Sequence, residues 1–215
     1  MPSLFILYAF NDRALPAPVW LEQYLLLPKA MQEKISRLRQ WQDRQASLLG
    51  KLLLLEGFKK LGYTPDLSLI AFDENQRPFT TLPFDFNIAH AGKYVLAAFN
   101  TEGRIGIDVE NIRPIQLPDF QSVLAPQEAA HLKQHPDPYR FFFHIWTKKE
   151  AVIKAEGRGI AHQLQLINTL DNPILLEDTY WHVQEVPLDA EHVCHFATAE
   201  NRAGQAVEIE QVALQ

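Results

Sequence analysis

Cysteine is almost absent from this chain of 215 residues, which contains only Cys194. A single cysteine excludes an internal disulfide and any cysteine-rich zinc site. Basic residues are not in excess either, since 20 Lys and Arg stand against 26 Asp and Glu, for a net charge of −6. A mildly acidic chain has no global attraction for nucleic acid or an anionic membrane. We therefore expect neither as a partner.

Long apolar runs are also missing. The stretch from Leu4 to Phe10 has no basic segment before it and is soon followed by Asp12 and Arg13. A bilayer span needs about 20 apolar residues, and a signal peptide needs a charged start. This stretch therefore predicts a buried strand, and we expect a cytoplasmic protein. Hydrophobic residues at 47% and aromatic residues at 11% indicate a globular core.

Proline and glycine positions divide the chain into helices and short strands. Pro28 opens an amphipathic helix over 28–41, and Gly62 ends a longer helix that starts near Asp43. Further helices are expected at 126–134 and 137–156, the latter closed by Gly157 and Gly159. We expect an extended connector at 113–118 and strands at 67–72, 84–90, 94–99, 104–109, 181–186, 192–196 and 206–210.

Each half of the chain combines helices with antiparallel strands, which is an α+β pattern. We predict two similar α/β lobes, residues 1–107 and 108–215, related by a pseudo-twofold axis with the active site in the cleft between them. One chain that supplies both lobes predicts a monomer. The first half has 12 basic and 10 acidic residues and the second has 8 and 16. The first half therefore suits an anionic ligand and the second suits a cation, although surface variation alone can give such a difference.

Two carboxylates, Asp108 and Glu110, stand two residues apart at the end of a predicted strand. Side chains at i and i+2 share one face of a strand, so Ile107 and Val109 point the other way. An exposed pair of this kind can serve solubility alone. Neighbouring like charges are nevertheless unfavourable unless a cation neutralises them.

The predicted helix over 137–156 places Trp146, Glu150 and Lys154 on one continuous face. A Glu–Lys pair at this spacing stabilises a helix by about 0.2–0.5 kcal/mol and needs no function. A tryptophan in line with the pair indicates that the face is partly buried. Together with Asp108 and Glu110, Glu150 completes a set of oxygen ligands without His or Cys. Such a set suits Mg²⁺ and disfavours zinc.

Mg²⁺ bound by a few carboxylates usually shares phosphate oxygens, and the first half offers groups that could bind phosphate. Each of these groups alone is more typical of an ordinary structural or solvated residue. The chain has no Walker loop and no Gly-x-Gly-x-x-Gly sequence, which excludes P-loop and Rossmann sites. The candidates are Arg44, Lys51, Arg77, His90 and the backbone of the Gly92 turn.

Several short motifs occur in one order along residues 43–159. They are Asp43-Arg44, Leu49-Gly50-Lys51, Gln76-Arg77-Pro78, Phe86-Asn87-Ile88-Ala89-His90-Ala91, Gly106-Ile107-Asp108-Val109-Glu110 and Trp146-Thr147-Lys148-Lys149-Glu150-Ala151-Val152-Ile153-Lys154. On these motifs the chain resembles the surfactin-type 4′-phosphopantetheinyl transferases. The last two motifs, in this order and at this separation, are the specific ones.

The resemblance implies an enzyme that transfers the phosphopantetheine arm of coenzyme A to a serine of an apo carrier protein. Adenosine 3′,5′-bisphosphate is then the second product. The carrier could belong to fatty-acid, polyketide or nonribosomal-peptide synthesis. By matched position, the resemblance implies Asp108, Glu150 and Lys154 as catalytic residues, Asp108, Glu110 and Glu150 as Mg²⁺ ligands, and Arg44, Lys51, Arg77, His90, Lys148 and Lys154 as contacts of coenzyme A.

The chain departs from the family pattern at two places. Ala89 and Ala91 flank the histidine where the family usually has serines, so two hydroxyls that could bind a phosphate are missing. Gln76 and Arg77 replace the usual glycine and lysine of a turn. Positive charge is retained there, but the turn is less permissive without glycine.

Carrier proteins are typically acidic, so a basic or apolar patch on the first lobe is the expected docking site. The helix at 28–41 offers one through Lys29, Lys34, Arg37 and Arg39. Two other functions are open. The same three acids suit a Mg²⁺-dependent pyrophosphate hydrolase, and the two alanines are consistent with a non-catalytic module that binds coenzyme A or a carrier protein.

Overall fold

The first half of the chain builds a helix-covered sheet. The computed structural model describes residues 2–158, 161–202 and 205–213. Strands β1 (Leu4–Phe10), β4 (Asp85–Ala91) and β5 (Tyr94–Asn100) pair antiparallel, and β10 (Glu208–Gln211) adds a parallel edge in the order β10-β1-β5-β4. Helices α1 (Ala17–Leu25), α2 (Lys29–Ser36) and α3 (Trp41–Lys60) lie on one side, and β2 (Ile70–Phe72) pairs with β3 (Pro78–Thr80).

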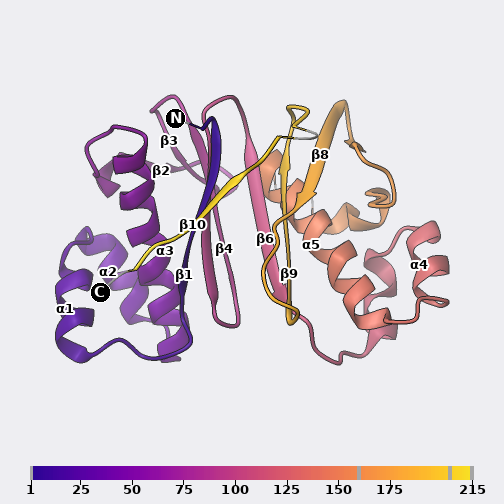
Figure 1. Ribbon diagram of the computed structural model, residues 1–215, viewed down its shortest axis with the longest axis horizontal. Coiled ribbons are helices and arrows are strands. Elements are labelled where there is room, and N and C mark those ends of the chain that lie inside the picture. The colour runs from indigo at the N-terminus through magenta and orange to yellow at the C-terminus, as the bar shows by residue number, and fades with distance from the viewer. Residues whose placement is uncertain (1, 159–160, 203–204, 214–215) are drawn as a thin grey trace.

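The second half builds a second sheet with its own long helix. Strands β6 (Ile105–Asn111), β7 (Ile174–Leu176), β8 (Thr179–Glu185) and β9 (His192–Thr198) pair antiparallel in the order β6-β9-β8-β7. Helix α5 (Pro138–Glu156) covers this sheet, and α4 (Pro126–Leu132) lies beyond it (Figure 1). Short 3₁₀ helices complete this half, η2 (Leu117–Val123) and η3 (Ala161–Leu166), as η1 (Leu67–Leu69) does in the first.

The two sheets pack face to face between α3 and α5, which gives four layers (Figure 1). Alternation along the strands explains this packing, because successive side chains point to opposite faces. In β1, Phe5 and Leu7 pack toward α3, whereas Leu4 and Ile6 join the cluster between the sheets. The inner strands are therefore buried on both faces and read as continuous apolar runs.

Strand β6 turns its apolar side chains toward the first sheet and the row of Gly106, Asp108 and Glu110 toward α5. A Cβ atom at Gly106 would stand 2.1 Å from the carbonyl oxygen of Ala151. Only glycine therefore allows α5 to lie this close to β6. This close contact brings the acidic residues of the strand against the helix.

Side chains join β4 to β6, because the two strands share no backbone ladder. The Asp85 carboxylate accepts from the backbone N–H of Ile105 at 2.8 Å, and the Asn87 side chain accepts from that of Ile107 at 3.0 Å. Arg77 donates two hydrogen bonds to Asp85, at 2.6 and 3.0 Å, and others to the Ile105 and Lys154 carbonyl oxygens. We call Arg77, Asp85 and Asn87 the inter-sheet junction.

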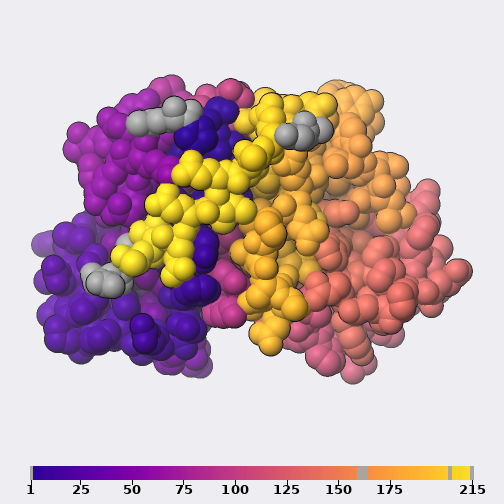
Figure 2. All heavy atoms as spheres, in the orientation of Figure 1, coloured from indigo at the N-terminus to yellow at the C-terminus, as the bar shows by residue number. Residues whose placement is uncertain are grey.

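The mixed α+β architecture is confirmed, and the same order recurs in both halves. Each has a strand, a long helix and then a hairpin whose last strand lies in the middle, as in β1-β5-β4 and β6-β9-β8. The division at residues 107 and 108 stays a prediction, and β6 spans that point. Figure 2 shows the C-terminal segment, in yellow, crossing from the second half to the first, where β10 joins β1.

Several local predictions were wrong in detail. The segment expected as a strand over 67–72 begins as η1, because the Asp66 side chain accepts from the backbone N–H of Ser68 at 2.8 Å and caps a turn. Helix α1 was missed, and η2 begins inside the expected connector. Gly157 ends α5 at a φ of 84° as expected, whereas Gly159 lies outside the described residues.

The turn from Asp73 to Arg77 forces a non-glycine residue into the left-handed region. The Asp73 carboxylate accepts from the backbone N–H groups of Asn75 and Arg77, and Gln76 has a φ of 63°. The left-handed conformation costs a residue with a Cβ atom about 1–2 kcal/mol. Gln76 therefore strains the turn that presents Arg77 to the inter-sheet junction.

We expect Gln76→Gly to raise the free energy of unfolding by about 0.5–1 kcal/mol, because the relief of strain exceeds the added entropy of the unfolded chain. Urea denaturation measures the change. Gln76→Ala is the matched control, since it removes the same side chain but keeps Cβ, and it should give no gain. Equal stabilisation by both variants would refute the strain.

An ion pair between α4 and α5 is fully buried. Lys149 Nζ lies 2.7 Å from Glu128 and also donates to the carbonyl oxygens of Val123, Leu164 and Ile167. Glu128 in turn accepts from the backbone N–H of Ala125 and from Thr169. Every partner of the pair is thus satisfied, which is the condition for keeping two charges away from water.

We expect Lys149→Met to lower the free energy of unfolding by about 3–5 kcal/mol, because Glu128 is left as an unpaired buried charge. Adding Glu128→Gln should recover part of this loss, since it removes that charge. Lys133→Met, at an exposed position on the same helix pair, is the control and should stay within about 0.5 kcal/mol. Urea denaturation compares the four proteins, and a double variant no more stable than the single one would contradict this account.

Candidate active site

The predicted acidic residues of β6 meet the predicted basic residue of α5. Lys154 Nζ lies 2.6 Å from Asp108 Oδ1 and donates to the Ile107 carbonyl oxygen at 3.2 Å. Asp108 is 6% exposed, and its second oxygen, Oδ2, is buried and has no hydrogen-bond partner among the residues that the structure describes. A buried carboxylate oxygen with no partner is costly, so this atom is available for a further ligand.

Burial raises the pKa of all three predicted carboxylic acids. In Asp108 the loss of solvent is partly offset by Lys154. In Glu110 and Glu150 the negative charge of Asp108 adds to the effect of burial, and in Glu110 a hydrogen bond from the Trp146 side chain opposes it. Asp108 therefore repels both glutamates in a partly dry environment, and a bound cation would relieve this repulsion.

The donor set fits Mg²⁺ by its chemistry. Asp108, Glu110 and Glu150 supply only hard oxygen atoms, and Asp108 Oδ2 is a buried acceptor that no described residue satisfies. Their ligand atoms are not gathered within 4.8 Å of one another, although two other groups of described residues are. The site is thus a loose one, in which Lys154 now neutralises Asp108.

His90 lies beside this group from the opposite sheet. It is exposed at the surface of β4, and its pKa is lowered by partial desolvation and by the charge of Lys154, with Asp43 and Asp108 acting the other way. Lys51 of α3 also acts on it. The structure therefore brings His90 and Lys51 of the first half toward Asp108 and Lys154 of the second.

The two predicted basic residues of α3, Arg44 and Lys51, differ in their hydrogen-bond partners. Burial and the charge of Lys34 lower the pKa of Lys51 to about 8, and its ammonium group donates to the backbone and the hydroxyl of Ser47 at 3.0 Å. Arg44 donates to the carbonyl oxygens of Leu38 and Arg39. Arg44 therefore holds the segment between α2 and α3, and its contact with a phosphate stays a prediction.

Arg77 and Lys148 lie apart from this group. Arg77 is 8% exposed, and its guanidinium group donates to Asp85 and to the carbonyl oxygens of Ile105 and Lys154. Lys148 points to the Thr169 carbonyl oxygen at 3.4 Å and lies near Glu185 and His195, because it is on another face of α5 than Lys154. Their contacts with coenzyme A also stay predictions.

The two alanines that replace the usual serines have a structural place. Ala89 is 4% exposed and Ala91 is half-buried, and both pack in the cluster between the sheets. They alternate with His90 along β4 and therefore point away from it. A hydroxyl group at either position would face apolar side chains rather than the side of the strand where His90 lies.

Sequence reasoning missed neighbours that only the fold brings near. The charge of Asp43 raises the pKa of His90, and the charge of Lys34 lowers the pKa of Lys51. No spacing in the sequence links the members of either pair.

A groove of about 720 Å³ lies over η2 and α4 and is lined by Leu124, Leu132 and Leu166 among others. It contains none of the predicted site residues. The cleft between the lobes stays a prediction.

Comparison with known proteins gives two adjoining matches. A family model described as the 4′-phosphopantetheinyl transferase superfamily matches residues 104–205. A second, described as 4′-phosphopantetheinyl transferase, N-terminal, matches residues 16–102. The first contains Asp108, Glu110, Glu150 and Lys154, and the second contains His90 and the basic residues of α3.

Individual relatives agree with the family models. The chain is 32% identical over 135 residues to the 4′-phosphopantetheinyl transferase Sfp of Bacillus subtilis strain 168, covering 60% of this chain and 59% of that protein. It is 33% identical over 127 residues to the transferase psf-1 of Bacillus pumilus, covering 57% and 54%. The chain thus spans less than two thirds of the length of these two relatives.

A third relative is matched over a longer stretch. It is a 4′-phosphopantetheinyl transferase of Bacillus subtilis, 30% identical over 158 residues, which are 71% of this chain and 70% of that protein. The resemblance drawn from the motifs is thereby confirmed. With both family models in the same order along the sequence, this chain belongs to the 4′-phosphopantetheinyl transferase family.

Proposed function

We propose that this protein transfers the 4′-phosphopantetheine arm of coenzyme A to a serine of an apo acyl or peptidyl carrier protein. The serine oxygen bonds to the phosphorus that bears pantetheine, the bond from that phosphorus to the pyrophosphate bridging oxygen breaks, and adenosine 3′,5′-bisphosphate leaves. The observation that carries the proposal is the buried Oδ2 of Asp108, which has no hydrogen-bond partner among the described residues. The same carboxylate pairs with Lys154 through Oδ1 and acts electrostatically on Glu110 and Glu150.

Asp108, Glu110 and Glu150 are the residues that would hold Mg²⁺. When bound, Mg²⁺ supplies positive charge that stabilises the pyrophosphate oxygens as the leaving group departs. Lys154 adds a cation on the same side of the site and would exchange its contact with Asp108 for one with a phosphate oxygen. Phosphoryl transfer is mostly positioning and charge neutralisation, and these residues supply both.

The serine hydroxyl must lose its proton during the transfer. We assign this proton to Glu150, which lies on α5 one turn from Lys154. The charges of Asp108 and Lys154 both act on the carboxyl group of Glu150. In the first half, the charges of Lys154 and Lys51 both act on His90, and we propose that His90 and Lys51 contact the phosphates at the adenosine end. Coenzyme A would then lie in a cleft between two lobes related by a pseudo-twofold axis.

Intact-mass spectrometry of an apo acyl carrier protein incubated with this protein, coenzyme A and Mg²⁺ tests the proposal. We expect a mass gain of one phosphopantetheine, abolished by EDTA. Asp108→Asn and Glu150→Gln keep the side-chain shape but remove a charge, and each should slow transfer at least about 100-fold, because such charges supply several kcal/mol. Asp12→Asn, at an exposed position, is the control and should transfer at the wild-type rate.

Other outcomes would point to the other two functions. Release of adenosine 3′,5′-bisphosphate from coenzyme A without any carrier protein would favour a pyrophosphate hydrolase. Binding of coenzyme A without turnover, with several carrier proteins tried, would favour a binding module. Full transfer by both Asp108→Asn and Glu150→Gln would refute the assigned metal site.

The basic surface of α2 is the proposed docking site for an acidic carrier protein. Lys29, Lys34, Arg37 and Arg39 are exposed on α2 and just after it. Lys34 also lies over the Phe72 ring, 4.4 Å from its centre, and acts on Lys51. The surface is therefore next to the predicted phosphate contacts, so its effects on the two substrates must be separated.

Reversing charge with Lys34→Glu and Arg37→Glu should raise KM for the carrier protein about tenfold at low salt and flatten its dependence on ionic strength. Arg13→Glu with Lys133→Glu changes the net charge equally at exposed positions elsewhere and is the control. Steady-state kinetics with each substrate varied gives the result. A rise in KM for coenzyme A alone would reassign Lys34 to the phosphate site.

A further inference from the structure

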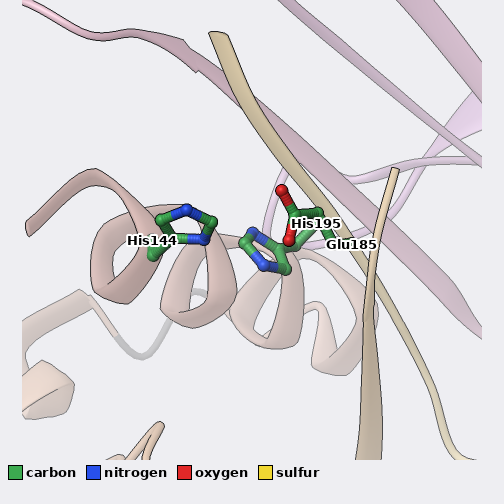
Figure 3. A group of neighbouring side chains, drawn as sticks. All are labelled: His144, Glu185 and His195. Carbon is green, nitrogen blue, oxygen red and sulfur yellow. The ribbon is translucent and has the colours of Figure 1, made fainter. Parts of the chain in front are cut away.

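A second group of possible metal ligands lies under α5, and none of the three carboxylates belongs to it. His144 comes from α5, Glu185 from the end of β8 and His195 from β9, and one ligand atom of each lies within 4.8 Å of the others. Figure 3 shows the two imidazole rings and the carboxylate turned toward one another from these three elements. Glu185 and His195 are direct cross-strand neighbours, so the sheet fixes their spacing.

A chain of hydrogen bonds sets the protonation of His195. Thr147 Oγ1 donates its single proton to the Phe143 carbonyl oxygen at 2.7 Å. The same oxygen lies 2.8 Å from His195 Nδ1. With the hydroxyl proton donated to the carbonyl oxygen, Thr147 Oγ1 accepts from His195, and we assign the ring proton to Nδ1 on this basis. Nε2 is then left with a free lone pair. A metal-binding histidine is ordinarily oriented in this way, through a hydrogen bond on its other nitrogen.

His195 is 2% exposed and His144 is half-buried, so both rings lie largely away from water. Metal ions bind the neutral form of imidazole.

The spacing of the two rings fits a tetrahedral ion. The ring centres of His144 and His195 lie 5.3 Å apart and the ring planes are 69° from each other. With zinc–nitrogen bonds of about 2.0–2.1 Å, two imidazoles on one tetrahedral ion place their ring centres about 5 Å apart. Glu185 is exposed, which gives the ion an entry from solvent and an anionic third ligand.

The cationic side chains near this cluster, Lys148 and Arg140, come from α5, and their charge opposes the binding of a metal cation. Lys148 acts on both Glu185 and His195, and Arg140 acts on His144. Lys148 has a weak alternative contact, the Thr169 carbonyl oxygen at 3.4 Å. The charges of Glu185 and Lys148 attract each other, so a metal ion would compete with this ammonium group for the carboxylate.

The other compact group, Asp189, Glu191 and His192, differs because its atoms already have partners. His192 Nδ1 bonds Asp189 at 2.8 Å, and His192 Nε2 lies 3.2 Å from the Asn111 side chain. Asp189 also pairs with Lys93 at 2.8 Å. This group is a closed hydrogen-bond network, whereas the tautomer of His195 leaves a nitrogen free.

We infer that His144, Glu185 and His195 form a binding site for Zn²⁺ or a similar late divalent transition metal, with water in the fourth position. Two histidines and one glutamate are an established ligand set for zinc, and imidazole is a poor ligand for Mg²⁺. The ion would tie α5 to β8 and β9, one strand from Asp108, which is paired with His195 across the sheet. The inference is independent of the proposed function.

Titration of the full-length, chelator-stripped protein with Zn²⁺ alone tests the site, in competition with a chromophoric chelator and with about 1 mM Mg²⁺ present. We expect one zinc ion per chain, and tetrahedral visible absorption bands when Co²⁺ is used instead. His144→Ala and Glu185→Gln should each weaken binding at least about tenfold, because each removes one of three ligands. His131→Ala, at an exposed histidine on α4, is the control.

Lys148→Met gives a test that misfolding cannot imitate, since removal of the competing charge should tighten zinc binding at least about threefold. Thermal unfolding adds a second readout, because an ion that binds only the folded state raises its Tm. Zinc should raise Tm in the wild type and not in His144→Ala. Unchanged affinity in both His144→Ala and Glu185→Gln, or Co²⁺ spectra without tetrahedral bands, would overturn the inference.

Discussion

The arrangement of the candidate site depends on the inter-sheet junction. Strands β4 and β6 run side by side without a ladder, and the side chains of Asp85 and Asn87 replace the missing backbone bonds to β6. Arg77 neutralises Asp85 and ties it to the last turn of α5. These contacts fix the register between the two halves. The histidine at the end of β4 and the acids at the end of β6 consequently lie on one side of the molecule.

Burial then decides the electrostatics of the site. A carboxylate that loses water needs a cation or a set of donors. Lys154 and the backbone N–H of Val109 act on Asp108, but its Oδ2 atom has no hydrogen-bond partner among the described residues. The glycine at 106 allows α5 to approach so closely that Glu150 and Lys154 share this environment. A site with one carboxylate oxygen left unpaired is less stable than a fully paired network, and such a compromise is expected where a ligand is to be bound.

Helix α5 serves the two proposed metal sites with different faces and different chemistry. Toward β6 it presents Glu150 and Lys154 to carboxylates, a hard oxygen environment for Mg²⁺ beside phosphate. Toward β8 and β9 it presents His144, while Thr147 fixes the proton of His195. Buried apolar residues such as Ala151 and Val152 fill the rest of its inner surface. The separation of ligand types would keep the two kinds of ion apart.

No described helix is long and apolar enough to cross a membrane.

The sequence by itself determined the α+β class, most long elements and the family, because periodicity and motif order are local properties of the chain. It also placed Asp108 and Glu110 on one face, since alternation along a strand is fixed by its geometry. Only the tertiary structure decided that Arg77 is buried in the junction, that the charge of Glu185 acts on Lys148, and that the rings of His144 and His195 are in contact. Such contacts join residues far apart in sequence through strand pairing and helix packing, and no local pattern encodes them.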